Sequence, residues 1–157
     1  MRKKLGYKKK GNHFTLHGQV HEGLALGKYK EQTGCRVGQY GLITCPDEPW
    51  LGCSPDGVTH CGKLVEIKCP VTRLIVPGEV PRHYLPQLQI SMHILGLESA
   101  DFFEWQQGQT NLVNVKRDQA YIDAMLPKLR AFYTEWQTLK REGRKPKRKR
   151  KVDHPFI

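Results

Sequence analysis

The chain has 157 residues, enough for one ordinary domain that buries its own core without disulfides or a structural metal. Hydrophobic residues make up 38% of it and charged residues 26%, which fits a soluble globular protein and argues against disorder along most of its length. No apolar run approaches the ~20 residues that a membrane-spanning helix needs. The amino-terminal residues also lack the apolar stretch of a secretory signal, so we expect neither a membrane protein nor a secreted one.

The net charge of +11 is concentrated at the two ends of the chain. Residues 1–10 contain six Lys or Arg and no acid, and residues 140–157 contain nine against two acids. Residues 11–139 carry a net charge of −2. Clustered basic residues of this kind most often bind a nucleic-acid backbone, where each neutralised phosphate releases counterions, with acidic proteins and anionic lipids as the competing partners.

The five cysteines form no C-x-x-C pair, and an odd number without a secretory signal predicts free thiols in a reducing compartment. Cys53, His60 and Cys61 could be considered as the ligands of a zinc ion. Their spacing matches no common zinc site, so we expect these thiols to be buried or without a function, and not to bind metal.

The predicted elements occur in the order helix, strands, helix, hairpin and helix. They are a helix at 14–33 ended by Gly34, an extended segment at 35–44, a loop at 45–49, strands at 51–53, 58–60 and 64–69, a proline-bounded connection at 71–81, a helix at 84–95 ended by Gly96, strands at 100–106 and 112–116, and a helix from the N-cap Asp118 to about residue 141. This order predicts one α/β domain with a mixed central sheet flanked by helices. We place the domain at residues 14–141, between a basic arm at 1–13 and a basic tail at 142–157.

In the last helix, apolar residues recur at helical spacing, which predicts simple core packing. They are Ile122, Met125, Leu129, Phe132 and Trp136.

Two charged residues in an apolar strand give the strongest chemical signal. Alternate side chains of a strand share a face, so Glu66 and Lys68 point to one side and Val65 and Ile67 to the other. Charged side chains are costly to bury without partners. One interpretation is that the strand lies at a sheet edge and that both charges are ordinary surface residues.

Asp56 favours the other interpretation, in which Glu66 and Lys68 belong to a functional site. If strands 58–60 and 64–69 pair across the turn at 61–63, Asp56 returns beside Glu66. Two adjacent carboxylates repel unless a cation lies between them, and hard oxygen ligands suit Mg²⁺ or Mn²⁺. Lys68 would then position or deprotonate a water molecule aimed at a phosphodiester.

Two helical residues fit the same site. Glu22 and Gln87 each lie beside apolar residues on one helix face. Taken alone, each is more often a residue at the margin of a core face. Together with Asp56 and Glu66, they are natural neighbours of a metal site.

These residues resemble the PD-(D/E)xK nucleases, and in particular the lambda exonuclease-like branch, also called the YqaJ viral recombinase family. The resemblance covers roughly residues 14–139. It rests on Gly18, Glu22 and Ala25, on Thr33 and Gly34, on 53–57, on 64–70, on Tyr84, Gln87, Gln89 and Met92, and on Val115, Arg117 and Asp118.

The resemblance implies a restriction-endonuclease-like fold and a role for each matching residue. Asp56 and Glu66 would bind a metal ion together with the carbonyl of Ile67, and Glu22 would help to hold a second ion, directly or through water. Lys68 would orient or activate the attacking water. Gln87 would support that arrangement by hydrogen bonding.

The resemblance also implies an activity. The family degrades double-stranded DNA from the 5′ end with Mg²⁺, forms a ring in its best-known member, a trimer, and works beside a single-strand annealing protein in recombination. We therefore expect a metal-dependent DNA exonuclease. Two alternatives stay open: a module that binds DNA without cutting it, and an endonuclease of the same fold.

The basic tail includes Lys147, Arg148, Lys149, Arg150 and Lys151, and it looks like a nuclear localisation signal. Such a signal would place the protein in the nucleus of a eukaryotic host, whereas without it the protein would be cytoplasmic. The alternative is that the tail only holds DNA. We expect these five residues and Ser54 to contact the nucleic acid.

Overall fold

The computed structural model of the chain describes the backbone of residues 13–144 and the side chains of residues 21–144. Within this range there are three α-helices and a short 3-10 helix: α1 (His13–Thr33), η1 (Arg82–Tyr84), α2 (Leu85–Leu95) and α3 (Gln119–Arg141). The strands are β1 (Val37–Gly38), β2 (Ile43–Thr44), β3 (Gly52–Cys53), β4 (Gly57–Thr59), β5 (Leu64–Lys68), β6 (Ser99–Gln106) and β7 (Gln109–Lys116). No described helix is both long and apolar enough to cross a bilayer.

The main sheet has five strands in the order β1-β4-β5-β6-β7. Only the β5–β6 pair is parallel, so the sheet is mixed, as predicted. The parallel pair needs a crossover, which the connection 71–81 and α2 provide. Glu66 and Lys68 therefore lie on a central strand, with β4 on one side and β6 on the other.

The segment predicted to be extended at 35–44 is divided between two sheets. β1 joins the main sheet, whereas β2 pairs with β3 in a separate two-stranded ribbon. The strands around residues 44 and 52 therefore lie outside the central sheet. Residues 39–42 lie in neither strand and carry the chain from one sheet to the other.

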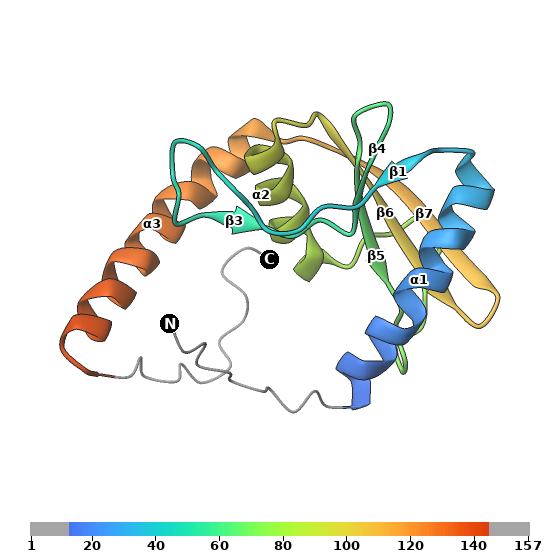
Figure 1. Ribbon diagram of the computed structural model, residues 1–157, viewed down its shortest axis with the longest axis horizontal. Coiled ribbons are helices and arrows are strands. Elements are labelled where there is room, and N and C mark those ends of the chain that lie inside the picture. The colour runs from blue at the N-terminus through green and yellow to red at the C-terminus, as the bar shows by residue number, and fades with distance from the viewer. Residues whose placement is uncertain (1–12, 145–157) are drawn as a thin grey trace, which may run out of the picture.

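The helices cover opposite faces of the main sheet (Figure 1). On one face, α1 packs on β5 and β6 through Ala25, Leu26, Tyr29, Val65, Ile67 and Phe103. On the other, α2 packs on the same strands through Leu64, Leu88, Met92, Ala100 and Phe102. Because strand side chains alternate, the face of Glu66 and Lys68 is the face that α2 covers.

The buried contacts of the last helix with α2 and the ribbon come from its first half. Ile122 and Met125 are buried and Leu129 is half-buried, as predicted. Phe132 and Trp136 were expected in the core, but they are 64% and 40% exposed. The reason is visible in Figure 1, where the second half of α3 extends beyond the sheet. There the ring of Tyr133 stacks between Trp50 and Trp136, with centroids 4.8 and 6.0 Å away.

Local signals in the sequence place several element ends. Gly96 ends α2 in the left-handed conformation, with φ of 64°, and Leu97 N donates to Met92 O. Gln107 and Gly108 both have positive φ in the tight β6–β7 turn, and Asp118 caps α3 by accepting from Tyr121 N.

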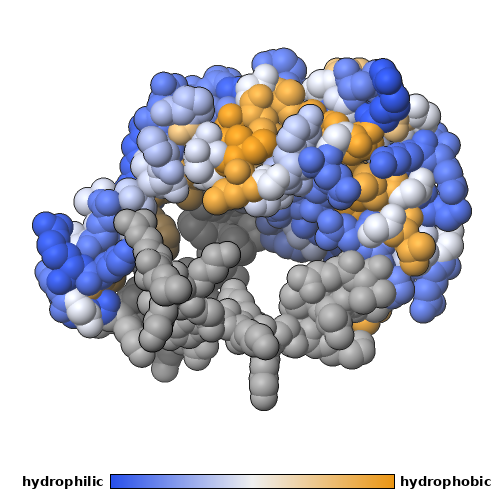
Figure 2. All heavy atoms as spheres, viewed as in Figure 1, coloured by the Kyte–Doolittle hydropathy of each residue, from blue (hydrophilic) through white to orange (hydrophobic). Residues whose placement is uncertain are grey.

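Figure 2 shows that apolar side chains gather in patches on the face of the molecule seen in Figure 1, between polar areas.

Candidate active site

The charged pair of β5 lies inside the protein. Glu66 is only 2% exposed, and the side chain of Lys68 is 22% exposed. Val65 and Ile67 point to the opposite face, against α1. The interpretation of Glu66 and Lys68 as surface charges on an edge strand is therefore wrong, because β5 is paired on both sides.

Asp56 is positioned by the antiparallel pairing of β4 with β5. Gly57 lies opposite Val65, so Asp56, one residue earlier, comes next to Glu66. The Asp56 Oδ2 atom accepts a hydrogen bond of 2.7 Å from the backbone N–H of Ile67. In a strand, the N–H and C=O of one residue point to the same side, so the Ile67 carbonyl faces the side on which Asp56 lies.

Glu66 is also held from the helix side. Its Oε1 atom accepts a hydrogen bond of 2.6 Å from Gln87 Nε2 and forms an ion pair with Lys68 Nζ. Gln87 lies in the first turn of α2, directly after Pro86. Strand and helix therefore fix the carboxylate together, and the structure brings Asp56, Glu66, Lys68 and Gln87 into one site.

Burial dominates the electrostatics of this site. It raises the pKa of both Asp56 and Glu66, and the charge of Asp56 raises the pKa of Glu66 further. Burial alone would lower the pKa of Lys68, but the charge and hydrogen bond of Glu66, together with the charge of Asp56, outweigh it, and the pKa of Lys68 is raised. Lys68 is therefore an ammonium group that donates hydrogen bonds.

Glu22, from α1, lies at the margin of the same site. Burial raises its pKa, the charge of Asp56 raises it further, and the charge of Lys68 lowers it. The oxygens of Glu22, Asp56 and Glu66 do not all lie within 4.8 Å of one another, however. Asp56 and Glu66 therefore form the central pair and Glu22 stands further out, where the resemblance gives it a role at a second ion.

A divalent cation fits this donor set. A buried carboxylate, a half-buried carboxylate and a backbone carbonyl are hard oxygen ligands of the kind that Mg²⁺ and Mn²⁺ take in proteins. The burial that raises both carboxyl pKa values is a cost that a cation would offset. The residues that would hold it are Asp56, Glu66 and Ile67, and Glu22 would contribute to a second ion.

Sequence reasoning gave no role to two further residues of the site. Lys68 Nζ lies 5.0 Å from the ring centroid of Tyr84, and Arg73 Cζ lies 5.9 Å from it, both within cation–π range. Arg73 also forms an ion pair with the fully buried Glu104, which lies beside Lys68 in the parallel β5–β6 register. The partner of Arg73 is 31 residues away in the chain, and no local pattern signals such a pair.

Of the residues predicted to contact nucleic acid, the structure describes only Ser54. Ser54 is exposed in the turn between β3 and β4, two residues before Asp56. Lys147, Arg148, Lys149, Arg150 and Lys151 lie outside the described residues, as do most of the predicted basic arm and tail.

A mixed sheet that carries Asp56, Glu66 and Lys68 at its centre, flanked by α1 and α2, defines a PD-(D/E)xK fold, and comparison with solved structures agrees. The chain is similar to an alkaline exonuclease from Laribacter hongkongensis, with a TM-score of 0.75, 28% identity, and coverage of 85% of this chain and 76% of that one. The same exonuclease in complex with dAMP matches with a TM-score of 0.76, 28% identity, and coverage of 86% and 76%.

The family model of the YqaJ-like viral recombinase domain matches residues 1–98 of the chain. The chain belongs to this family, as the resemblance in its motifs predicts. A curated relative, an uncharacterized protein of Acanthamoeba polyphaga mimivirus, is 27% identical over 110 residues. That match covers 59% of this chain and 20% of the viral protein, so the chain spans about a fifth of the relative's length.

Proposed function

We propose that this protein is a nuclease that hydrolyses phosphodiester bonds of double-stranded DNA with a divalent metal ion, starting from 5′ ends. The observation that carries the proposal is the convergence of Asp56 and Glu66 with Lys68 and Gln87 at the centre of the sheet. Membership of the YqaJ-like family and the likeness to an alkaline exonuclease support it.

In this proposal each residue has one task. Asp56, Glu66 and the Ile67 carbonyl hold Mg²⁺, which Mn²⁺ can replace, and Glu22 contributes to a second ion. When bound, the ions polarise the phosphodiester and lower the pKa of a coordinated water. Lys68 orients that water through its ammonium group. Gln87 keeps the Glu66 carboxylate in place by donating to Oε1.

The function is tested by digestion of a linear duplex by the purified full-length chain. We expect loss of the duplex with Mg²⁺ and none with EDTA, with a 5′ label released first and a 3′ label retained longest. A closed circular duplex is the matched control, because an exonuclease needs an end. A duplex without a 5′-phosphate shows whether the enzyme requires that group.

Two outcomes would replace the proposal. No metal-dependent loss of any DNA would indicate a module that binds without cutting. Cleavage of the closed circle at the rate of the linear duplex would indicate an endonuclease of the same fold.

We also propose that the basic tail adds sequence-independent affinity for DNA. Residues 145–157 contain six Lys or Arg, and each phosphate contact adds about 0.9 to the slope of log K against log salt. Replacing Lys147, Arg148, Lys149, Arg150 and Lys151 with Gln is therefore expected to flatten that slope by up to about 4 to 5. Fluorescence anisotropy with a labelled duplex in EDTA measures it. An unchanged slope would mean that the tail does not touch DNA.

Three further expectations are proposals for this chain, the first two from the family resemblance and the third from the basic tail. They are a homo-oligomeric ring of three chains, a single-strand annealing protein as partner in recombination, and a nuclear location directed by the tail. The first is tested by light scattering of the purified chain. The last is tested by comparing where the wild-type chain and the variant with the five Gln substitutions accumulate in a eukaryotic cell.

A further inference from the structure

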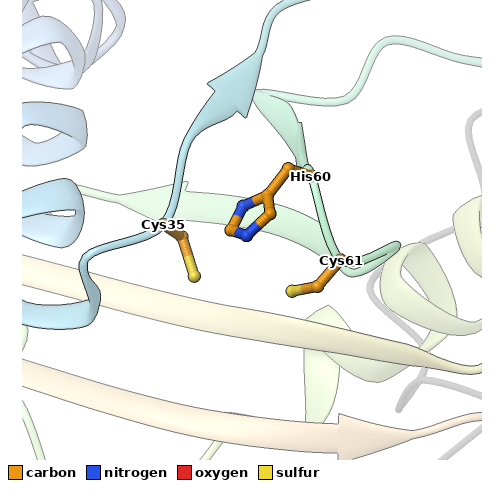
Figure 3. Close-up of side chains that lie close together, drawn as sticks. All are labelled: Cys35, His60 and Cys61. Atoms are coloured by element: carbon orange, nitrogen blue, oxygen red, sulfur yellow. The ribbon is translucent and has the colours of Figure 1, made fainter.

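Two thiols and an imidazole meet at the end of β4 opposite to Asp56. The ligand atoms of Cys35, His60 and Cys61 all lie within 4.8 Å of one another. Figure 3 shows the three side chains converging from the segment before β1 and the segment after β4. All three are at least partly accessible, and both cysteines are free thiols.

The β1–β4 pairing explains why residues so far apart in the chain meet. Val37 lies opposite Thr59, and His60 N donates to Arg36 O at 3.0 Å, which continues the antiparallel ladder by one residue. Cys35 precedes this ladder, and Cys61 lies in the turn that follows it. The pairing therefore brings both thiols to the same end of β4, where they lie within reach of one ion.

The turn that carries Cys61 is held firmly. Thr59 Oγ1 lies 3.2 Å from Cys61 Sγ and accepts from Lys63 N at 2.9 Å, and Gly62 N donates to Thr59 O at 3.0 Å. Hydrogen bonds of this kind around metal ligands fix their orientation and reduce the cost of assembling the site. The threonine thus positions one ligand before any ion binds.

We infer that Cys35, His60 and Cys61 form a zinc site. Thiolate and imidazole are the ligands that Zn²⁺ takes in proteins, at about 2.3 and 2.0–2.1 Å, and tetrahedral coordination leaves a fourth position for water. Two thiolates neutralise the charge of the ion. The nearby cation, Lys63, does not oppose it, because Lys63 Nζ is paired with Asp101 Oδ2 at 3.2 Å.

This site is separate from the nuclease site. Asp56 precedes β4 and His60 follows it, and at about 3.3 Å per residue the two positions are roughly 13 Å apart. The zinc ligands also differ in chemistry, since sulfur and nitrogen favour Zn²⁺ where carboxylates favour Mg²⁺. A zinc ion here would join the end of α1 to the turn between β4 and β5 and stabilise the fold.

The test uses the reduced, zinc-free protein in excess Mg²⁺, which competes with zinc for the carboxylates of the proposed nuclease site. We expect one equivalent of Zn²⁺ to bind and to raise the melting temperature. Co²⁺ should bind in its place and give the thiolate charge-transfer absorption of a cysteine-ligated ion. Cys35→Ser and Cys61→Ser should each remove this absorption, and His60→Asn should weaken zinc binding at least tenfold.

Cys53→Ser is the matched control, since Cys53 lies in β3 outside the cluster, and it should bind zinc like the wild type. This control also separates the structural cluster from the grouping of Cys53, His60 and Cys61 considered from the sequence. The proposal is overturned if reduced wild-type protein binds no zinc, or if both serine variants at Cys35 and Cys61 keep the cobalt absorption. A Cys35–Cys61 disulfide in air, with no zinc bound after reduction, would overturn it as well.

Discussion

Replacing Asp56 with asparagine is expected to lower the rate of DNA cleavage by about 10³-fold or more. A bound metal ion contributes several kcal/mol of transition-state stabilisation, and each ~1.4 kcal/mol changes the rate tenfold. The amide oxygen of Asn can still accept the hydrogen bond from Ile67 N, so the turn before β4 should keep its shape. The rate of duplex loss in Mg²⁺ measures the effect.

The same variant should not be less stable than the wild type without metal. Burial raises the pKa of Asp56 in the folded protein, so the charged carboxylate is disfavoured by folding. A neutral Asn removes that cost at neutral pH. As the pH falls, Asp56 takes up its proton in the folded state before the unfolded state, which removes the cost of the buried charge. The wild type then becomes more stable, and the difference in melting temperature between it and Asp56→Asn disappears. Melting temperatures in EDTA at several pH values test the direction.

Mg²⁺ should raise the melting temperature of the wild type and leave that of Asp56→Asn almost unchanged, because only the wild type keeps the site. Glu98→Gln is the matched control: Glu98 is exposed and precedes β6, and its substitution removes the same charge. The assignment fails if Asp56→Asn cleaves at the wild-type rate. It fails as well if Glu98→Gln loses cleavage to the same degree.

The core of the site could be predicted from the sequence because its parts are local. Asp56 and Glu66 are joined by one hairpin, and the alternation of β5 places Glu66 and Lys68 on one face. A register of this kind follows from short-range turn and strand signals. Placing Gln87 beside Glu66 needed more, because the pairing of β5 with β6 is what brings α2 over that face. The helix pattern of Gln87 suggested only a residue at the margin of a core face, and the family resemblance strengthened its assignment to the site.

Other features depend on contacts that no local pattern encodes. The sequence did not predict the ribbon of β2 and β3, because two-residue strands carry too little alternation to be assigned to a sheet. It grouped Cys53 with Cys61, whereas the β1–β4 register brings Cys35 there instead. The exposed end of α3 has helical periodicity like its buried half, since periodicity shows which residues share a face and not whether another element covers it.

The ion pair between Arg73 and Glu104 is the feature that the sequence predicts least, and it holds the connection 71–81 on the sheet. Glu104 is fully buried in β6, where it also accepts a hydrogen bond of 3.0 Å from Asn111 Nδ2. Asn111 in turn donates to Glu79 O at 2.8 Å and accepts from Gly78 N at 2.9 Å. These contacts fix both halves of the connection 71–81 on the β6–β7 hairpin, next to Lys68 and Tyr84.

Arg73→Ala is therefore expected to lower the free energy of unfolding by about 3 kcal/mol, since it leaves the Glu104 carboxylate buried without a cation. This is the low end for a broken buried pair, because the Arg73 side chain is 32% exposed and water can reach the site. Urea unfolding measures the change. The double variant Arg73→Ala/Glu104→Gln should recover part of the loss, because the stranded charge is gone and the Gln side-chain oxygen can still accept from Asn111.

Cleavage by the same two variants separates stability from catalysis. If Arg73 only holds the connection in place, the double variant should regain activity together with stability. If Arg73 also binds the phosphate backbone beside Lys68, the double variant should stay slow although it is stable, with weakened DNA binding. The single variant Glu104→Gln completes the comparison. If the double variant loses as much unfolding free energy as the two single variants together, the two side chains are not coupled and the ion pair is contradicted.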